Sequence, residues 1–268
     1  MTNRQTGEKI LVMKRGLKFA GKVMLILLCL YLVSGCSLLG KKSKKDLKAQ
    51  QMASKIQDIN HDILTSRGTG NLSLTRNGKT ETYRMAWVAK WPLSLRMTLL
   101  SSGIPVETIA ADGKSVTLVS HTGQHAPHTI NRSNPSLVRI ISLPVKLGEI
   151  IALLTGKIPL KGSENVIWQM DKQNTSKLVF KNWMGTPTEE IFLNENSQVI
   201  EYWQLAPGAP PAIKLRFDEF KRFDRYTISG KIIFTDSQNR RLVLQITSFT
   251  PNISLENKDQ IFHLTESG

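Results

Sequence analysis

The chain has 268 residues, of which 36 are Lys or Arg and 21 are Asp or Glu, so its formal net charge at pH 7 is +15. A basic chain of this kind is a candidate nucleic-acid binder, but its first 36 residues indicate export, which removes that partner. Anionic lipid head groups are the more natural partner, although most of the lysines are expected to form solvated surface.

Residues 1–35 are predicted to be an export signal. The apolar run from Val23 to Val33 is about half the length that a helix needs to cross a bilayer, yet it suits the core of a signal peptide. Four basic residues precede it: Lys14, Arg15, Lys18 and Lys22. This pattern argues against a simple transmembrane span.

The run ends in Val33-Ser34-Gly35-Cys36, which resembles the lipobox of bacterial lipoproteins. That resemblance implies cleavage just before Cys36 and a diacylglycerol on its thiol, so we expect no cofactor other than this covalent lipid. The alternative is a cysteine that merely follows an ordinary signal peptide. Cys29 lies in the discarded run, so the mature chain would have neither a free thiol nor a disulfide.

Residues 36–45 read as a lipidated cationic tether, because the lysines between Lys41 and Lys48 repel one another and keep the chain extended. Removal of residues 1–35 leaves 30 basic and 20 acidic residues, a net charge near +10. By analogy with other lipoproteins, Ser37 in place of an aspartate favours the periplasmic face of the outer membrane over the inner membrane.

Residues 46–268 are predicted to form one mainly β domain. An amphipathic helix begins near Asp46, with apolar residues at 52, 56, 59 and 63, and is expected to end near 66–68. A helical stretch over 134–156 interrupts the β pattern. Alternating or short apolar runs predict strands at 85–91, 93–99, 106–110, 116–118, 166–170, 177–183, 188–194, 197–204, 212–219, 227–235, 240–249 and 261–264.

A meander of about ten or eleven antiparallel strands must curl, because an open sheet of that width leaves its edges and its apolar face uncovered. The helices of 46–65 and 134–156 are the segments available to fill the concave side. The five tryptophans fall on predicted strands, where core packing or a rim explains them better than a ligand lining.

The sequence contains none of the familiar catalytic motifs. We therefore expect that the protein is not an enzyme. The tempting cluster is "HTGQHAPH", with His121, His125 and His128. Three imidazoles can ligate zinc, but Gly123 and Pro127 prevent the helix that would align them. A solvated hairpin loop is the favoured interpretation, with no metal.

Two stretches of the sequence resemble the family of the periplasmic lipoprotein carrier LolA and its outer-membrane receptor LolB. "WPLSLRMTLLSSGIPVETIAADGKSVTLV" is similar to two central strands and a hairpin, and "LPVKLGEIIALLTGKIP" is similar to the LolB helix segment. The resemblance implies an unclosed antiparallel β-barrel with a helical lid, whose cavity binds acyl chains. The residues expected to line that cavity are Met85, Trp87, Trp91, Leu95, Met97, Leu147, Ile150, Ile151 and Leu154.

Two positions depart from the family pattern. Trp91 stands before Pro92 where LolA carries an arginine that latches its lid. LolB delivers its cargo with a protruding leucine in the next turn, where this chain offers Ile104 as a membrane transfer residue.

Two functions remain open at this point. The favoured one is a monomeric, lipid-anchored protein that binds the acyl chains of lipoproteins, with phospholipid, other lipoproteins and a periplasmic carrier as partners. The other is an anchored structural or interaction lipoprotein, acting in envelope assembly or stress sensing without lipid transfer.

Overall fold

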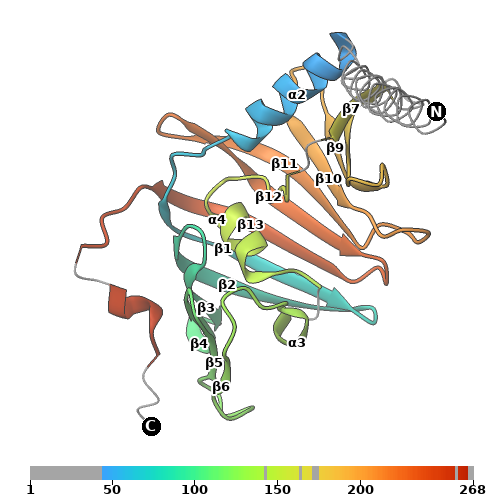
Figure 1. Cartoon of the computed structure of the whole chain (residues 1–268). Coiled ribbons are helices and arrows are strands. Elements are labelled where there is room, and N and C mark those ends of the chain that lie inside the picture. The colour runs from blue at the N-terminus through green and yellow to red at the C-terminus, as the bar shows by residue number, and fades with distance from the viewer. Residues whose placement is uncertain (1–43, 142–143, 163–164, 171–174, 257–258, 265–268) are drawn as a thin grey trace, which may run out of the picture. The chain divides into compact units, whose positions relative to one another are not determined.

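One antiparallel sheet that does not close into a barrel dominates the computed structural model (Figure 1). The structure describes residues 44–141, 144–162, 165–170, 175–256 and 259–264. Cys36, Ser37 and the predicted signal peptide lie outside these residues. No helix among the described residues is both long and apolar enough to cross a membrane.

Thirteen strands pair in the described part of the chain. They are β1 (Thr65–Arg76), β2 (Lys79–Lys90), β3 (Ser94–Ser101), β4 (Ile104–Asp112), β5 (Val116–Ser120), β6 (His128–Ile130), β7 (Asn165–Met170), β8 (Ser176–Lys181), β9 (Pro187–Leu193), β10 (Val199–Gln204), β11 (Ile213–Phe223), β12 (Tyr226–Asp236) and β13 (Arg241–Pro251). The helices are α2 (Lys44–Gln57), α3 (Val138–Ile141), α4 (Leu147–Leu154) and the short 3-10 helix η2 (Asp259–Phe262).

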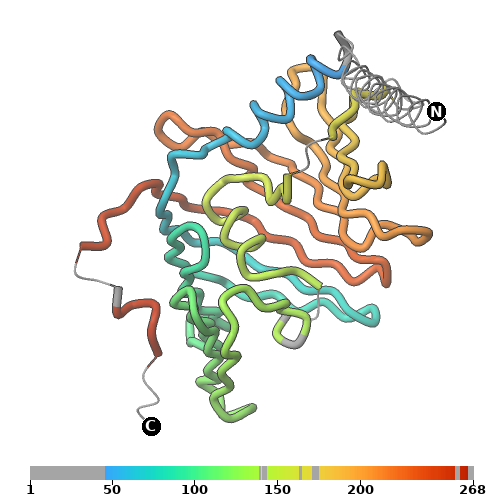
Figure 2. The backbone as a smooth tube through the Cα atoms, in the orientation of Figure 1, coloured from blue at the N-terminus to red at the C-terminus, as the bar shows by residue number. Residues whose placement is uncertain are grey.

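The order of the strands in the sheet is β6-β5-β4-β3-β2-β1-β13-β12-β11-β10-β9-β8-β7. Two runs of consecutive hairpins therefore meet in the middle of the sheet, where β1 pairs with β13. The edge strands are β6 and β7, and the chain between them contains α3 and α4 (Figure 2). We call this connecting segment, residues 131–164, the lid.

The predicted fold class is confirmed: the domain is mainly β, with an unclosed antiparallel sheet, a helical lid and an N-terminal helix. The predicted count of ten or eleven strands is wrong. The sequence interpretation missed β1 and β6, and it placed a strand at 261–264 where the chain forms η2.

The first helix is also shorter than predicted, since α2 ends at Gln57 and β1 begins at Thr65. Asn60 stops the helical path with a φ of 53°. Its side-chain Nδ2 donates hydrogen bonds to the carbonyl oxygens of Gly156 and Thr227, at 2.7 and 3.2 Å. This turn leaves Ile63 fully buried in the core, but outside the helix.

Candidate functional site

Helix α4 lies over the apolar face of the sheet, as Figure 1 shows. Its buried residues are Leu147, Ile151, Ala152, Leu153 and Leu154. At its start, the backbone N–H of Lys146 donates to the Glu149 carboxylate at 2.9 Å, and at its end Gly156 adopts a φ of +72°. Local sequence therefore sets both ends of the helix, while its apolar residues hold it on the sheet.

A small apolar cavity of about 30 Å³ remains between α4 and the sheet. Its wall is formed by the side chains of Leu72, Met85, Met97, Leu137, Ile150, Leu153, Leu154, Phe234, Leu242 and Leu244. No polar residue contributes to this wall, so apolar packing holds the middle of α4 on the sheet. The space is close to that of a single water molecule.

A second cavity, of about 170 Å³, lies between the end of α4, the residues after α2, and strands β11 and β12. Its apolar wall includes Ile59, Ile158, Phe217, Ile228 and Ile232, and Lys157 also lines it. Leu153 borders both cavities.

The structure divides the nine residues predicted to line an acyl cavity into three groups. Met85, Met97, Ile150 and Leu154 line the smaller cavity. Trp87, Leu95, Leu147 and Ile151 are buried in the core beside it. Trp91 lies in the turn after β2 and remains 39% exposed.

Several lining residues were not predicted from the sequence, namely Leu72, Leu137, Leu153, Phe234, Leu242 and Leu244. Phe234, Leu242 and Leu244 belong to strands that the sequence did predict, on the face that alternation makes apolar. Their position opposite α4 depends on the pairing of β1 with β13, which no local pattern shows.

A buried hydroxyl connects the lid to the sheet. Ser66 is fully buried, and its Oγ donates a hydrogen bond of 2.6 Å to the carbonyl oxygen of Leu154. The indole Nε1 of Trp87 donates to the same hydroxyl at 3.2 Å. The Trp87 ring lies where a side chain at Gly68 would stand, 2.3 Å from an ideal Cβ, so only glycine leaves it this space.

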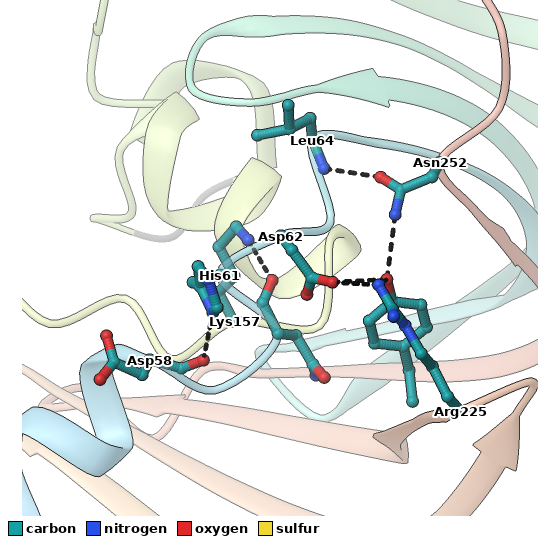
Figure 3. A network of polar contacts seen from close by, with 9 residues as sticks. Asp58, His61, Asp62, Leu64, Lys157, Arg225 and Asn252 are labelled. Carbon is teal, nitrogen blue, oxygen red and sulfur yellow. Dashed lines mark hydrogen bonds and ion pairs between the residues drawn. The ribbon is translucent and has the colours of Figure 1, made fainter.

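Lys157 forms a second connection to the lid (Figure 3). It is only 8% exposed, its ammonium donates to the carbonyl oxygen of Asn60, and it lies 5.7 Å from the centroid of the Trp91 ring. Burial lowers the pKa of Lys157, and the negative charge of Asp62 opposes that shift. Trp91 thus contacts the end of the lid, although through a different pairing from the arginine latch of LolA.

Asp62 lies in the turn before β1 and belongs to the same polar network. Its partners in that network lie at the start of β12 and just after the end of β13. Its carboxylate accepts hydrogen bonds from the hydroxyl of Tyr226, at 2.9 Å, and from Arg225. The bond from Tyr226 is the main reason why the pKa of Asp62 is lowered. Asn252 in turn donates to the Tyr226 hydroxyl at 3.1 Å and accepts from the Leu64 N–H at 2.9 Å (Figure 3).

The three histidines of the predicted loop do not converge. His121 Nε2 is 2.8 Å from the Thr108 hydroxyl, His125 Nε2 is 2.9 Å from the Glu107 carboxylate, and His128 begins strand β6. A carboxylate therefore does orient one ring, but it comes from β4. No group of three metal-binding side chains gathers anywhere in the part of the chain that the structure describes.

Two hairpin turns expose large apolar side chains. Ile104, the predicted transfer residue, is 67% exposed beside the Ser102-Gly103 turn. Trp183 and Met184 occupy the turn between β8 and β9. The prediction that all five tryptophans lie on strands is therefore wrong for Trp183 and Trp91, which lie in turns.

Comparison with solved structures places this fold among known ones. A DUF1329 family protein from Desulfovibrio piger superposes with a TM-score of 0.58 at 10% identity, over 82% of this chain and 98% of that one. A LolA superfamily protein from Nitrosomonas europaea superposes with a TM-score of 0.53 at 13% identity, over 81% and 97%. At these identities the likeness concerns the fold.

No protein-family model matches the sequence, and no curated protein matches it either. The resemblance to LolA therefore extends to the shared fold, while the particular likeness to LolB rests on the sequence motifs.

Proposed function

We propose that this protein is a lipid-anchored envelope protein that binds acyl chains between its lid and the apolar face of its sheet, and that it acts in the localisation or insertion of lipoproteins at the outer membrane. No bond is made or broken in this role, so the protein is not an enzyme. Cys36 carries the anchor, at the periplasmic face, and the domain acts as a monomer.

The observation that carries this proposal is the apolar lining of the space between α4 and the sheet. Exposure of apolar surface to water costs roughly 25 cal/mol per Å². An acyl chain that takes the place of α4 would cover the same apolar surface of the sheet and would itself be removed from water. The lid and a lipid would then compete for the same surface, which makes binding reversible.

The two cavities beside α4 are smaller than the usual ligand pocket of about 300–1,000 Å³. Acyl binding therefore requires that α4 move away from the sheet. Leu153 would have to move with the helix, because it borders both the cavity of about 170 Å³ and the apolar space under α4. Few polar bonds resist this movement, and the main ones join Ser66 to Leu154, Lys157 to Asn60, and Asn60 to Gly156.

Uptake of a fluorescent fatty acid by the full-length protein tests the proposal. We expect saturable binding that a Leu153→Trp substitution weakens about tenfold or more, because the larger ring fills the space between α4 and the sheet. Val138→Trp, at an exposed site elsewhere on the lid, serves as the matched control and should bind normally. Absence of uptake by the wild-type protein, or equal uptake by Leu153→Trp and wild type, would contradict acyl binding at this place.

The anchor and the cargo are tested separately. Mass spectrometry of the protein from membranes should show acylation of Cys36, and transfer of a lipoprotein from its periplasmic carrier should occur in vitro. Binding of fatty acid without lipoprotein transfer would leave a lipid-binding protein with another cargo.

The second candidate is an anchored structural or interaction lipoprotein on the same scaffold. The observation in its favour is the nearly filled space under α4, which matches a lid that stays in place. In that case crosslinking would capture a protein partner, and a lid held closed by a disulfide between α4 and β1 would keep full function. Acyl binding predicts that such a crosslink abolishes it.

A further inference from the structure

The turn between β8 and β9 presents two apolar side chains to solvent. Trp183 is 88% exposed and Met184 is 68% exposed, the two highest values among the large apolar residues of the described chain. Tryptophan is costly to expose in this way, because its ring carries a large apolar area. The turn lies outside the lid and the cavities described above.

The geometry of this turn is fixed by its own polar groups. The side-chain Oδ1 of Asn182 accepts hydrogen bonds from the N–H groups of Met184 and Thr186, both at 3.0 Å. Gly185 adopts a φ of +80°, and its N–H donates to the Asn182 carbonyl oxygen at 2.9 Å. The turn therefore holds Trp183 and Met184 outward on an ordered support.

The edge of the sheet that contains this turn is basic. The strand pairings place the turns after β1, β3, β5, β8, β10 and β12 at the same edge. Among the described residues of these turns and of the positions that flank them, the charged ones are Arg76, Lys79, Lys181, Asp236, Arg240 and Arg241.

Most of this positive charge has no partner at the edge. The only acid in the set, Asp236, is buried and paired with Arg240, while Arg76 lies 3.5 Å from Glu81. Lys79, Lys181 and Arg241 have no acidic partner among the described residues. The opposite edge is mixed in charge, and Asp62, Asp112, Glu195 and Asp224 lie there. The edge that carries Trp183 is thus complementary to an anionic surface.

Helix α2, the first described element, packs beside the strands that lead to this turn. Helix α2 packs on β7, where Lys48 lies 4.7 Å from the centroid of the Trp168 ring, and β7 pairs with β8 (Figure 1). Seven residues lie between Cys36 and Lys44, the first residue of α2, so an extended chain of at most about 28 Å connects them. A lipid on Cys36 would therefore keep the domain close to a bilayer.

We propose that Trp183 and Met184 insert into the interfacial layer of an anionic phospholipid bilayer, with Lys79, Lys181 and Arg241 facing the head groups. Tryptophan favours this layer, where its ring is in contact with acyl chains and its N–H with water. Each basic residue near an anionic surface adds about 1 kcal/mol of attraction. The contact orients the domain, and it is distinct from the Ile104 turn and independent of acyl uptake.

Fluorescence quenching by brominated phospholipid tests the proposal on the full-length protein in vesicles of phosphatidylglycerol and phosphatidylethanolamine. Bromine on the acyl chains quenches only a tryptophan that enters the bilayer. We expect Trp183→Phe to reduce the quenching at least about twofold, and the matched control Trp91→Phe to leave it nearly unchanged. The double substitution Lys181→Gln, Arg241→Gln should reduce the quenching in a salt-dependent manner.

Equal quenching of the wild type and Trp183→Phe would overturn the proposal. It would also fail if aqueous iodide reached Trp183 equally well with and without vesicles. Protection from iodide without quenching by bromine would mean that another copy of the chain covers the turn in place of lipid, which would also overturn the proposal. Because Trp183→Phe should retain normal fatty-acid uptake, a failure here is distinguishable from a failure of the acyl-binding function.

Discussion

Ser66 Oγ donates a hydrogen bond to the carbonyl oxygen of Leu154, although the two residues are 88 positions apart in the chain. This bond lies in a buried, otherwise apolar contact, where an unpaired polar group costs more than at the surface. It is therefore the most specific link between the end of α4 and the sheet.

Replacement of Ser66 by alanine should loosen the lid. The variant leaves the Leu154 carbonyl and the Trp87 N–H without this partner, so we expect a loss of about 1–3 kcal/mol in the free energy of unfolding. Hydrogen exchange should accelerate at the amides of 151–157. The control is Ser73→Ala, also on β1, whose hydroxyl shares an exposed bond with Thr82 and should cost under about 0.5 kcal/mol. Equal losses in both variants would contradict the role assigned to Ser66.

Lys157→Met should change how stability depends on pH. Because burial lowers the pKa of Lys157 in the folded state, the unfolded chain binds the proton more tightly, and this residue favours folding increasingly as pH rises toward 10.5. The variant should lose that part of the rise, which urea unfolding at about pH 8 and about pH 10 would measure. Lys161→Met, at an exposed site, should keep the wild-type slope. A wild-type slope in Lys157→Met would argue against a buried ammonium.

The buried hydrogen bond between Tyr202 and Glu189 lies in the sheet near the end of the lid, and its contribution to stability can be measured. The Tyr202 hydroxyl donates to the Glu189 carboxylate at 2.6 Å, and both residues are buried. Burial and the neighbouring carboxylate raise the pKa of Tyr202 far above its ordinary value, so the hydroxyl stays a donor. Tyr202→Phe should cost about 1.5–3 kcal/mol in a urea titration.

Tyr83→Phe is the matched control for that substitution, because the Tyr83 hydroxyl donates to Glu81 at the surface. We expect it to cost less than about 0.5 kcal/mol. If the two variants were equally stable, the buried bond would contribute nothing measurable.

His125 should titrate above its ordinary range. A hydrogen bond to the Ala126 carbonyl and the Glu107 carboxylate raise the pKa of His125 above 6.5. Its contribution to stability is therefore fully present below about pH 6.5 and lost as pH rises through the folded value. NMR titration of the ring should show a lower pKa in Glu107→Gln, whereas Glu81→Gln should leave it unchanged. No difference between the two variants would place the cause elsewhere.

Alternation of apolar and polar residues predicted most of the sheet because one face of each strand is buried. The pattern failed for β1, because three of its buried, inward positions hold Ser66, Gly68 and Gly70 in place of large apolar residues. The Asn77-Gly78 pair, a strong hairpin signal, would have located the end of that strand. β6 has three residues and no apolar stripe.

Helical spacing predicted α4 correctly and overextended α2. Ile59 and Ile63 continue the spacing of the helix, but Asn60 forms bonds to residues far along the chain, and tertiary contact decides where the helix ends. The site shows the same limit. Met85 and Leu154 were predicted, whereas the role of Ser66 depends on a partner that only the folded chain brings near.

The pairing of β1 with β13 has a consequence for the order in which the protein is built. Thr69 and Ser248, bonded across this central seam, are 179 positions apart, while the remaining strand pairs join neighbours in the chain. The chain is synthesised from its N-terminus, so β1 can pair with β2 as soon as both are made. Its other edge stays unpaired until β13, the last strand, is available. The first hairpin thus keeps an unprotected edge until the final strand is available to pair with it.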